Sequence, residues 1–542
     1  MPTPDTTPAA TSAAAPSGAV PATADVAIVG FGPVGKLLAL RLGRAGHRVL
    51  VVDRNLAGYP LPRAVTHCSD FARILQSVGL GPDTIGEVTQ PYDDMYVWRD
   101  AEGRSLVEVD WSGLGESGWY NTYFFSQPAL EDKLDDLVAQ LPSVTVCRGW
   151  QATGIEQDAD GATLSLRATD GDEEAVVRAS WLIGADGANS AVRRWSGIEW
   201  ADLGFFYDWL VVDVIPDPAL EFPHVARQNC DPHRPATMVP GGPGRRRWEF
   251  MRLPHETKDE LNRAETAWKL LEPYGLTEEN SVLERHSVYT FQACWATRWR
   301  DGRVLLAGDA AHLMPPFAGQ GLGAGVRDAM NLGWKLDAVL SGRAPEALLD
   351  TYGAERLPHA RAFIDFSVGL GKVICLTDEA EAAARDERMI AEWAAGMKPP
   401  APPRPGLGEG LHAGEHGGAL AIQARLSVGG EEPRLADDAL DGPGALVVSD
   451  AAQLAGLDAD TLAGLRSLGI TPVALDGLPS PEVLLAEDVD GTWTTWLADL
   501  GVSAVLVRPD FHLYGAGDDA VALATGFLRA VATCGQEAPV PA

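Results

Sequence analysis

Three glycines near the start of the chain have the spacing of a dinucleotide-binding turn. Gly30, Gly32 and Gly35 fall in GFGPVG, between the apolar run VAIVG and a helical stretch over residues 33–45. Glycines at these positions permit a tight turn and let the backbone approach a pyrophosphate, and the following helix N-terminus offers N–H groups and partial positive charge. The motif therefore predicts phosphate contacts from Gly30, Gly32, Pro33, Val34 and Gly35.

Asp53 supports this prediction from the end of the next strand. Residues 48–52 have the pattern of a second β-strand, and the carboxylate that follows them can accept hydrogen bonds from a ribose hydroxyl. Strand, helix and second strand together form a βαβ unit. The unit predicts dinucleotide binding, but it does not distinguish FAD from NAD.

Two later motifs do distinguish them. GADGANSAVR begins at Gly184 and GDAAHLMPPFAGQG begins at Gly308, each at the end of an apolar strand. Each motif places an aspartate, Asp186 or Asp309, at the carboxyl end of its strand, where ligands of α/β sheets bind. The helix after Gly321 is apolar along one face, and its N-terminus directs a positive dipole end at an anion. Reduced flavin is such an anion, so the pattern favours FAD.

The three motifs together resemble those of the class A flavoprotein monooxygenases, the para-hydroxybenzoate hydroxylase and phenol hydroxylase family. Within that family the sequence is most similar to the 3-(3-hydroxyphenyl)propionate hydroxylases, through PRA at 62–64, QSVGL at 76–80 and RVLLAGDAAH at 303–312. The resemblance covers residue 25 to about residue 370. The C-terminal part matches the phenol hydroxylase branch only in pattern.

The resemblance implies a set of flavin contacts. Asp53 takes the ribose position, which is usually a glutamate, and Asp309 bonds the ribityl chain. Pro316 lines the isoalloxazine ring, and residues 319–321 meet its pyrimidine edge. The other contacts in the implied set are Arg54, Arg63, Gln127, Asp186, Gly187, Gly308, Gly319, Gln320, Gly321 and Leu322.

The base that ionises a phenolic substrate is not identified by the sequence. The candidates for substrate contact or catalysis are His67, Tyr123, Arg234, His312 and Pro316. Three consecutive arginines, 245–247, follow a Pro-Gly turn, which predicts a solvated hairpin in preference to a clamp for a substrate carboxylate. The apolar side chains that come next are predicted to be core; they are Trp248, Phe250 and Met251.

The implied reaction is a single-component aromatic hydroxylation. NADH or NADPH, bound transiently, reduces FAD, O2 adds at flavin C4a, and the hydroperoxide attacks an electron-rich ring carbon of a phenol such as a 3-(3-hydroxyphenyl)propionate-like acid. One alternative is a polycyclic, polyketide-like substrate undergoing hydroxylation, epoxidation or Baeyer–Villiger insertion, because fold does not fix reaction. A halogenase is disfavoured, since no WxWxIP-like stretch is present. A flavin-binding scaffold without turnover is an alternative from another class.

The expected fold class is α/β: a Rossmann-like FAD-binding domain, an inserted antiparallel-sheet substrate domain and a C-terminal thioredoxin-like domain without CxxC. The predicted boundaries run in chain order. They are a disordered tail at 1–23, the FAD-binding domain at 24–200 and 299–395 with a helical region, the substrate sheet at 201–298, a Pro- and Gly-rich linker at 396–435, and the C-terminal domain at 436–542.

Composition excludes several other classes. The net charge of −32 would repel nucleic acid and anionic membranes. The 6 cysteines are scattered without metal-ligand spacing, so no metal site and no disulfide framework are predicted. No apolar run is long enough to cross a bilayer, and the first residues lack a signal-peptide pattern, so a cytoplasmic location is expected. The expected partners are a small aromatic substrate and O2, and a homodimer is one open alternative.

Overall fold

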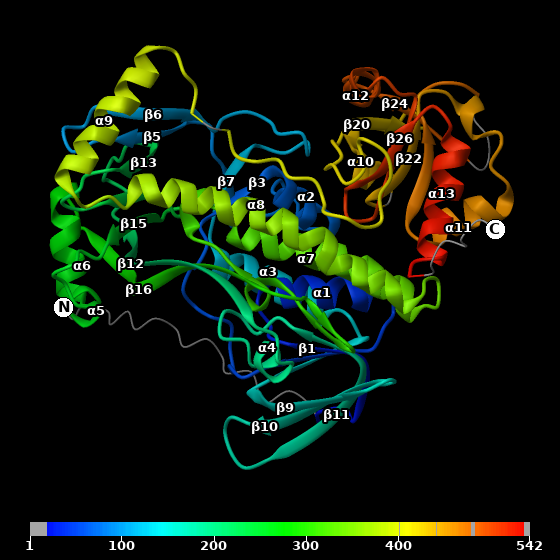
Figure 1. The fold of residues 1–542 in the computed structure, drawn as a ribbon, viewed down its shortest axis with the longest axis horizontal. Coiled ribbons are helices and arrows are strands. Elements are labelled where there is room, and N and C mark those ends of the chain that lie inside the picture. The colour runs from blue at the N-terminus through cyan, green and yellow to red at the C-terminus, as the bar shows by residue number, and fades with distance from the viewer. Residues whose placement is uncertain (1–18, 400, 441, 479–482, 536–542) are drawn as a thin grey trace, which may run out of the picture.

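A computed structural model describes residues 19–399, 401–440, 442–478 and 483–535 of the 542-residue chain (Figure 1). Most of the predicted tail lies outside these residues. The predicted disordered tail, 1–23, extends too far along the chain. Val20 already packs on the core, and Thr23 begins the first strand, where it pairs with Arg178.

The glycine-rich turn belongs to a mostly parallel sheet of order β17-β18-β11-β1-β2-β8, extended by an antiparallel hairpin. Its central strands are mostly buried, as strands covered on both faces must be, whereas the edge strand β8 is partly exposed. Its strands are β1 (Thr23–Val29), β2 (Val49–Asp53), β8 (Val144–Arg148), β9 (Trp150–Asp158), β10 (Gly161–Ala168), β11 (Glu174–Gly184), β17 (Arg300–Asp301) and β18 (Val304–Leu306). Helices α1 (Pro33–Arg44), α3 (Gln127–Ala139), α4 (Ala191–Trp195) and α7 (Gly321–Leu340) contact one another or these strands.

A second, largely antiparallel sheet has the order β19-β16-β12-β15-β14-β13-β5-β6. Its strands are β5 (Met95–Arg99), β6 (Ser105–Asp110), β12 (Trp200–Pro216), β13 (Ala226–Asn229), β14 (Ala236–Pro240), β15 (Arg246–Met251), β16 (Ser281–Ala296) and β19 (His312–Leu313). The predicted boundary at 201 is therefore incomplete. β5 and β6 come from the first part of the FAD-binding region, and β5 joins because it pairs in parallel with β13.

The two faces of this substrate sheet carry different side chains because residues alternate along each strand. Leu210, Val212 and Trp248 lie on the face packed against α6 (Ala264–Leu271), with α5 (Lys258–Leu261) nearby. Trp209 and Met251 lie on the opposite face, with residues from the end of α8 (Asp350–Ile374). We call this second face the inner face. Trp248, Phe250 and Met251 are core residues, as predicted.

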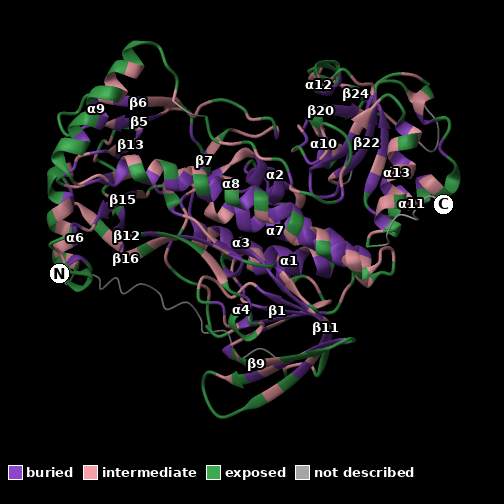
Figure 2. Ribbon diagram, viewed as in Figure 1, coloured by how far each residue is buried: buried purple, intermediate pink, exposed green. Residues whose placement is uncertain are grey.

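A small sheet of order β3-β7-β4 packs beside the inner face. It consists of β3 (Thr66–Cys68), β4 (Thr89–Pro91) and β7 (Thr122–Phe125), and α2 (Ser69–Ser77) follows β3. Helix α7 is buried along most of its length, whereas α9 (Glu379–Ala394) at the edge of the molecule is mostly exposed (Figure 2).

The C-terminal sheet has the order β21-β20-β24-β23-β22-β25-β26. Its elements are β20 (Arg425–Val428), β21 (Arg434–Leu435), α10 (Ala436–Ala439), β22 (Gly444–Val448), α11 (Ala459–Ser467), β23 (Ile470–Ala474), β24 (Leu484–Asp488), α12 (Thr492–Leu500), β25 (Ala504–Val507), β26 (Leu513–Gly517) and α13 (Ala520–Ala532). The predicted linker, 396–435, thus ends too late, because β20 pairs antiparallel with β24 inside this sheet.

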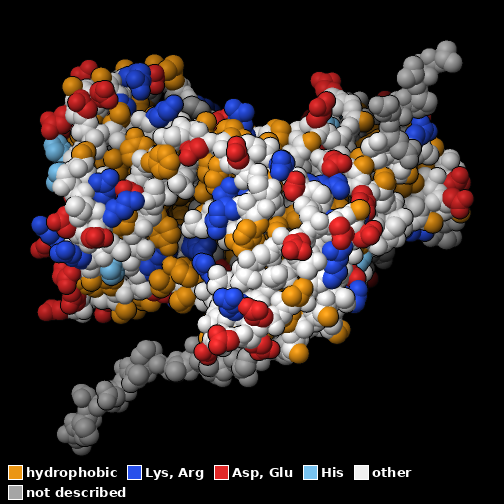
Figure 3. Space-filling view, turned by 60° about the horizontal axis from the view of Figure 1, so that its bottom comes forward, with side chains coloured by type: hydrophobic (Ala, Val, Ile, Leu, Met, Phe, Trp, Pro, Cys, Tyr) orange, Lys and Arg blue, Asp and Glu red, His pale blue; other side chains and the backbone are white. Residues whose placement is uncertain are grey.

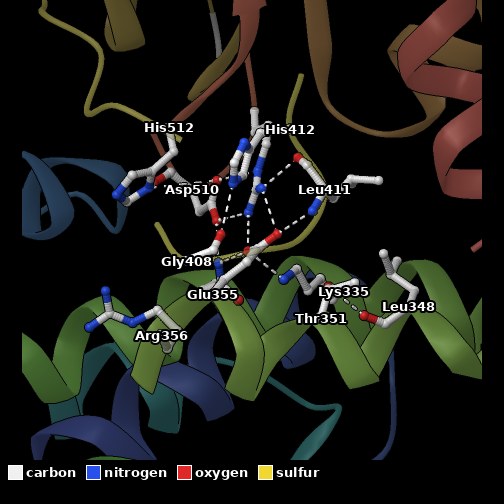
Figure 4. A network of polar contacts seen from close by, with 12 residues as sticks. Lys335, Leu348, Thr351, Glu355, Arg356, Gly408, Leu411, His412, Asp510 and His512 are labelled. Atoms are coloured by element: carbon white, nitrogen blue, oxygen red, sulfur yellow. Dashed lines mark hydrogen bonds and ion pairs between the residues drawn. The ribbon is translucent and has the colours of Figure 1, made fainter. Parts of the chain in front are cut away.

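A buried ionic network joins the C-terminal sheet to α7 and α8 (Figure 4). Glu355 accepts hydrogen bonds from Lys335 Nζ at 2.6 Å, from both terminal nitrogens of Arg508 at 2.9 and 2.8 Å, and from Leu411 N at 2.7 Å. Burial opposes ionisation of Glu355, but Arg508 and Lys335 hold its pKa well below the usual value. The same desolvation lowers the pKa of Lys335 to about 8. The network is satisfied only while the two parts stay together.

Glu355→Gln should therefore loosen the C-terminal part. Removing one partner of a buried pair leaves an uncompensated charge and costs roughly 3–5 kcal/mol. We expect a lower thermal midpoint and faster proteolysis between residues 400 and 420, with Glu409→Gln, an exposed glutamate of the same segment, as control. Because the folded-state pKa of Glu355 is lowered, its contribution is present above the ordinary value of ~4.3 and is lost as pH falls. Equal stability of both variants at pH 7 would contradict this account.

Candidate flavin and substrate site

The glycine-rich turn has three different kinds of glycine. Gly30 has a φ of +106°, and a Cβ there would lie 2.3 Å from the carbonyl oxygen of Ala185. A Cβ on Gly35 would lie 2.1 Å from the carbonyl oxygen of Gly30. At Gly32, by contrast, a Cβ would meet no described heavy atom within 4 Å. Gly30 and Gly35 are thus needed for packing, and Gly32 keeps a space open in front of α1, whose N-terminus no described side chain caps.

The aspartates of the first two motifs fix the backbone around this space. Asp53 accepts hydrogen bonds from Phe31 N at 2.9 Å and Asn55 N at 2.8 Å, so it holds the turn itself. Asp186 accepts hydrogen bonds from Ser190 Oγ and from two backbone N–H groups at the start of α4. Next to it, Gly187 adopts a φ of +79°. The structure thus shows local roles for both carboxylates beside the space at Gly32.

The third motif is anchored by Asp328. One oxygen of this buried carboxylate accepts hydrogen bonds from Gly308 N at 3.0 Å and lies 2.7 Å from His312 Nε2, and the other accepts one from Arg356 Nε at 2.9 Å. His312 therefore supports the loop. Asp309 itself is exposed to solvent, and desolvation by the surrounding protein raises the pKa of its carboxyl, an effect that the charge of Arg63 partly offsets. Because Asp309 is exposed to solvent and yet closely surrounded by protein, it lies in a concave part of the surface.

Helices α1 and α7 meet at their N-termini. Val34 lies close to both Gly308 and Gly325, where an added Cβ would come within 2.9 and 2.8 Å of its Cγ2. The first turn of α7 follows η3 (Pro316–Ala318) and Gly319, which has a φ of +64°, and no described side chain caps it. Two uncapped helix N-termini, the open space at Gly32 and the exposed Asp309 form one cradle. This arrangement fits the pyrophosphate and ribityl parts of FAD.

The remaining predicted cofactor contacts surround this cradle or support it. The ring of Tyr59 stacks with the Arg63 guanidinium, which lies 4.8 Å from the ring centroid. Gln127 accepts a hydrogen bond from Ala64 N and donates one to Glu131, so it positions the loop before β3. Gln320 accepts a hydrogen bond from Arg327 at 3.0 Å. Of the remaining two, Arg54 directly follows β2 and Leu322 lies in the first turn of α7.

The inner face of the substrate sheet lies opposite the cradle. One end of this face is aromatic, and we call it the aromatic wall; the other end is ionic. At one end Phe317 of η3, next to Pro316, contacts the rings of Trp209 and Phe291 at centroid distances of 5.6 and 5.8 Å. At the other end Arg247 donates two hydrogen bonds to Asp213, at 2.7 and 2.9 Å. In Figure 3 hydrophobic and basic side chains line a hollow of the molecular surface.

The prediction of a solvated arginine hairpin is wrong for Arg247. Its side chain is 4% exposed, and it also donates hydrogen bonds to the carbonyl oxygens of Pro62 and Arg63. Arg246 packs on the ring of Phe222, and Arg245 pairs with Glu284. The alternation of β15 turns Trp248 and Phe250 to one face, and it thereby turns Arg247 to the inner face beside the cofactor loop.

The predicted substrate contacts do not all lie together in the structure. His67 is buried, stacked on Tyr123 and hydrogen-bonded to Thr89 Oγ1, and burial lowers its pKa to about 4. Burial raises the pKa of Tyr123 to about 12. Arg234 does not join the group, because its guanidinium pairs with Glu256 and bonds the carbonyl oxygen of Met251. Pro316 is exposed beside the aromatic wall.

Four residues near the site were not identified from the sequence. Asp328 lies under the third motif, and three others lie on the inner face: Glu249, Arg285 and Tyr289. Arg285 is 3% exposed, and its Nε and Nη1 atoms have no hydrogen-bond partner among the described residues. The period-two pattern of RRRWEFM is the signal that could have identified Glu249.

Comparisons with known proteins agree with this geometry. Residues 23–367 match the FAD binding domain family, and residues 418–530 match the HcaD C-terminal domain. The chain is 38% identical to a "Probable NADH-specific resorcinol 4-hydroxylase" of Rhodococcus jostii, over 97% of this chain and 98% of that one. It is 34% identical to a 3-(3-hydroxy-phenyl)propionate/3-hydroxycinnamic acid hydroxylase of Klebsiella pneumoniae, over 91% of each chain.

A solved structure of aklavinone-11 hydroxylase with FAD and aklavinone is also similar, with a TM-score of 0.73 and 25% identity over 94% of this chain and 98% of that one. Fold and site define a flavin-dependent aromatic hydroxylase. The chain belongs to the FAD binding domain family of class A flavoprotein monooxygenases, uses FAD as cofactor and takes electrons from a nicotinamide.

Among the described residues, no helix is long and apolar enough to cross a membrane. No group of three or more His, Cys, Asp or Glu side chains in the described ranges is placed to hold a metal ion.

Asp309→Ala should remove the one exposed carboxylate at the base of the cradle and yield mostly flavin-free protein. The ratio of flavin absorbance at 450 nm to protein absorbance at 280 nm measures this directly. Asp460→Ala, at an exposed position on α11, is the matched control and should keep its flavin. Full flavin content in Asp309→Ala would show that the cradle is assigned to the wrong ligand.

Proposed function

We propose that this enzyme hydroxylates a small monocyclic phenol, with a dihydroxybenzene such as resorcinol as the preferred type, and that NADH is its electron donor. The 38% identity to the resorcinol 4-hydroxylase extends over nearly the whole of both chains and supports both parts. The observation that carries the substrate class is the inner face, where an aromatic wall meets polar groups opposite the flavin cradle.

FAD, when bound in the cradle, supplies the electron transfer and the oxygen transfer. The residues of the chain bind the cofactor and the substrate, orient them and shield them from water. The N-termini of α1 and α7 stabilise negative charge on the cofactor, and Asp309 orients its sugar-alcohol chain. Trp209, Phe291 and Phe317 hold the aromatic ring of the substrate and exclude water, which limits wasteful side reactions.

A phenol that carries a carboxylate side chain is the second candidate. It is favoured by Arg285, whose Nε and Nη1 atoms are buried on the inner face without a hydrogen-bond partner among the described residues. A guanidinium in this state suits a carboxylate, which accepts charge-assisted hydrogen bonds. The hydroxyphenylpropionate hydroxylase relatives act on acids of this kind by name.

We also infer that the C-terminal part is a thioredoxin-like domain with a structural role. β22 pairs in parallel with β23 and antiparallel with β25, and β25 pairs antiparallel with β26, which together form a βαβ unit followed by a ββα unit. Its sequence has no CxxC, so thiol–disulfide exchange is not its function. The C-terminal domain is docked through Glu355 and thereby supports α7 and α8. We propose that the enzyme forms a homodimer.

The substrate assignment predicts that resorcinol accelerates NADH oxidation by the purified, flavin-loaded enzyme and yields a product with one added oxygen atom. Stopped-flow absorbance at 340 nm and mass spectrometry under ¹⁸O2 give the two readouts. We expect a smaller response to 3-(3-hydroxyphenyl)propionate and to NADPH. Stimulation by polycyclic phenols alone would refute the monocyclic assignment, and a stronger response to the propionate would favour the second candidate.

A further inference from the structure

Glu249 lies in the middle of the inner face. In β15 it pairs with Val211 of β12 on one side and with Thr237 of β14 on the other. Side chains directly opposite one another in antiparallel strands share a face. Trp209, which pairs with Met251 two residues further along, lies on the same face and contacts the rings of Phe291 and Phe317. The carboxylate of Glu249 therefore lies between the aromatic end of the face and its ionic end.

Among the described residues, this carboxylate has one long ion pair and receives no hydrogen bond. Its nearest cation is Arg247, with 3.8 Å between Nη1 and Oε1, and no hydrogen bond from any described residue reaches it. Arg247 is instead held by Asp213 and by the carbonyl oxygens of Pro62 and Arg63. The Glu249 side chain is 12% exposed and is therefore not fully closed off from solvent.

The other titratable groups near this space already have partners. Both oxygens of Asp213 accept hydrogen bonds from Arg247. Tyr289 lies 3.4 Å, oxygen to oxygen, from Tyr59, and its ring is covered by Arg285. His67 is bonded to Thr89, and His312 to Asp328. Among the described residues of the inner face, Glu249 is the carboxylate left without a donor.

We propose that Glu249 is the base that ionises the phenolic substrate. The substrate O–H bond breaks, its proton forms an O–H bond with a carboxylate oxygen of Glu249, and the electron pair stays on the phenolate oxygen. The carboxylic acid returns the proton to solvent or to product oxygen after the ring has been hydroxylated. This inference rests on the proposed function and gives it a catalytic residue.

The chemistry of the surroundings suits this step. A phenolate donates electron density to its ring and is a better target for an electrophilic oxygen than the neutral phenol. Burial raises the pKa of Glu249, which makes its carboxylate a stronger base toward a phenol whose own pKa is near 10. The guanidinium of Arg285 forms a long ion pair with Asp213 at 3.7 Å and has two nitrogens without a hydrogen-bond partner among the described residues, so it can stabilise negative charge at the same end of the face.

The pH dependence of this step also depends on the charged and titratable groups around Glu249. The charged and titratable groups that share its face come from four strands: Asp213 from β12, Arg247 from β15, Arg285 and Tyr289 from β16, and Tyr96 from β5. Burial raises the pKa of Tyr96 and of Tyr289, so both stay neutral at physiological pH.

The test compares flavin-loaded wild type, Glu249→Gln and Glu249→Asp on a series of phenols of increasing acidity between pH 6 and 10, measuring the rate of hydroxylated product. We expect Glu249→Gln to lose roughly 10²–10⁴-fold with weakly acidic phenols, the range of general-base catalysis. The loss should shrink with more acidic phenols and with rising pH, because the substrate then ionises without help. Glu249→Asp should recover part of the rate.

Flavin content, thermal midpoint and substrate-free NADH oxidation serve as checks on folding, and Glu265→Gln, exposed on the helix that covers the other face, is the matched control. An equal loss for all phenols at every pH, or no loss at all, would overturn the assignment of Glu249 while leaving the proposed function intact. Failure of every phenol to give product with the wild type would overturn the proposed function and this inference with it.

Discussion

The ligand-facing loop of this enzyme depends on one buried carboxylate, that of Asp328. It binds the backbone N–H of Gly308, the ring of His312 and the guanidinium of Arg356. Burial disfavours its charge, yet His312 and Arg356 lower its pKa. Because the loop is held from behind, Asp309 is free to face the cradle. A buried charge is costly unless it is fully bonded, so the loop has little freedom to move separately from α7 and α8.

Helix α7 extends this arrangement in both directions. Its polar side chains follow the helical repeat and bond to separate parts of the molecule at the two ends of the helix. Arg327 pairs with Asp70 beside the first turn, and Asn331 and Lys335 bond to Glu355 near the C-terminal sheet. The same helix begins at the cofactor cradle and ends against the C-terminal domain. Helix α7 therefore carries both the polar contacts that support the flavin-site loop and those that dock the C-terminal domain.

The sequence could predict the local structure on the cofactor side of the site because the signals there are local, whereas the individual flavin contacts remain predictions. The roles of Gly30, Gly32 and Gly35 follow from spacing within one turn, and the aspartates of the later motifs follow directly from strand ends. The substrate side was not predictable in this way. Arg247 and Glu249 depend on which face of β15 turns inward, and that depends on pairing with β12, far away in the sequence. Likewise, no local signal places β5 beside β13.

A crystal structure of the enzyme with FAD and resorcinol tests the account most directly. The account predicts the pyrophosphate of FAD at Gly32 between the N-termini of α1 and α7, the ring of resorcinol against Trp209 and Phe317, and a phenolic oxygen within hydrogen-bond distance of Glu249. A resorcinol ring bound elsewhere, or a flavin whose isoalloxazine ring lies away from Pro316 and the inner face, would contradict it.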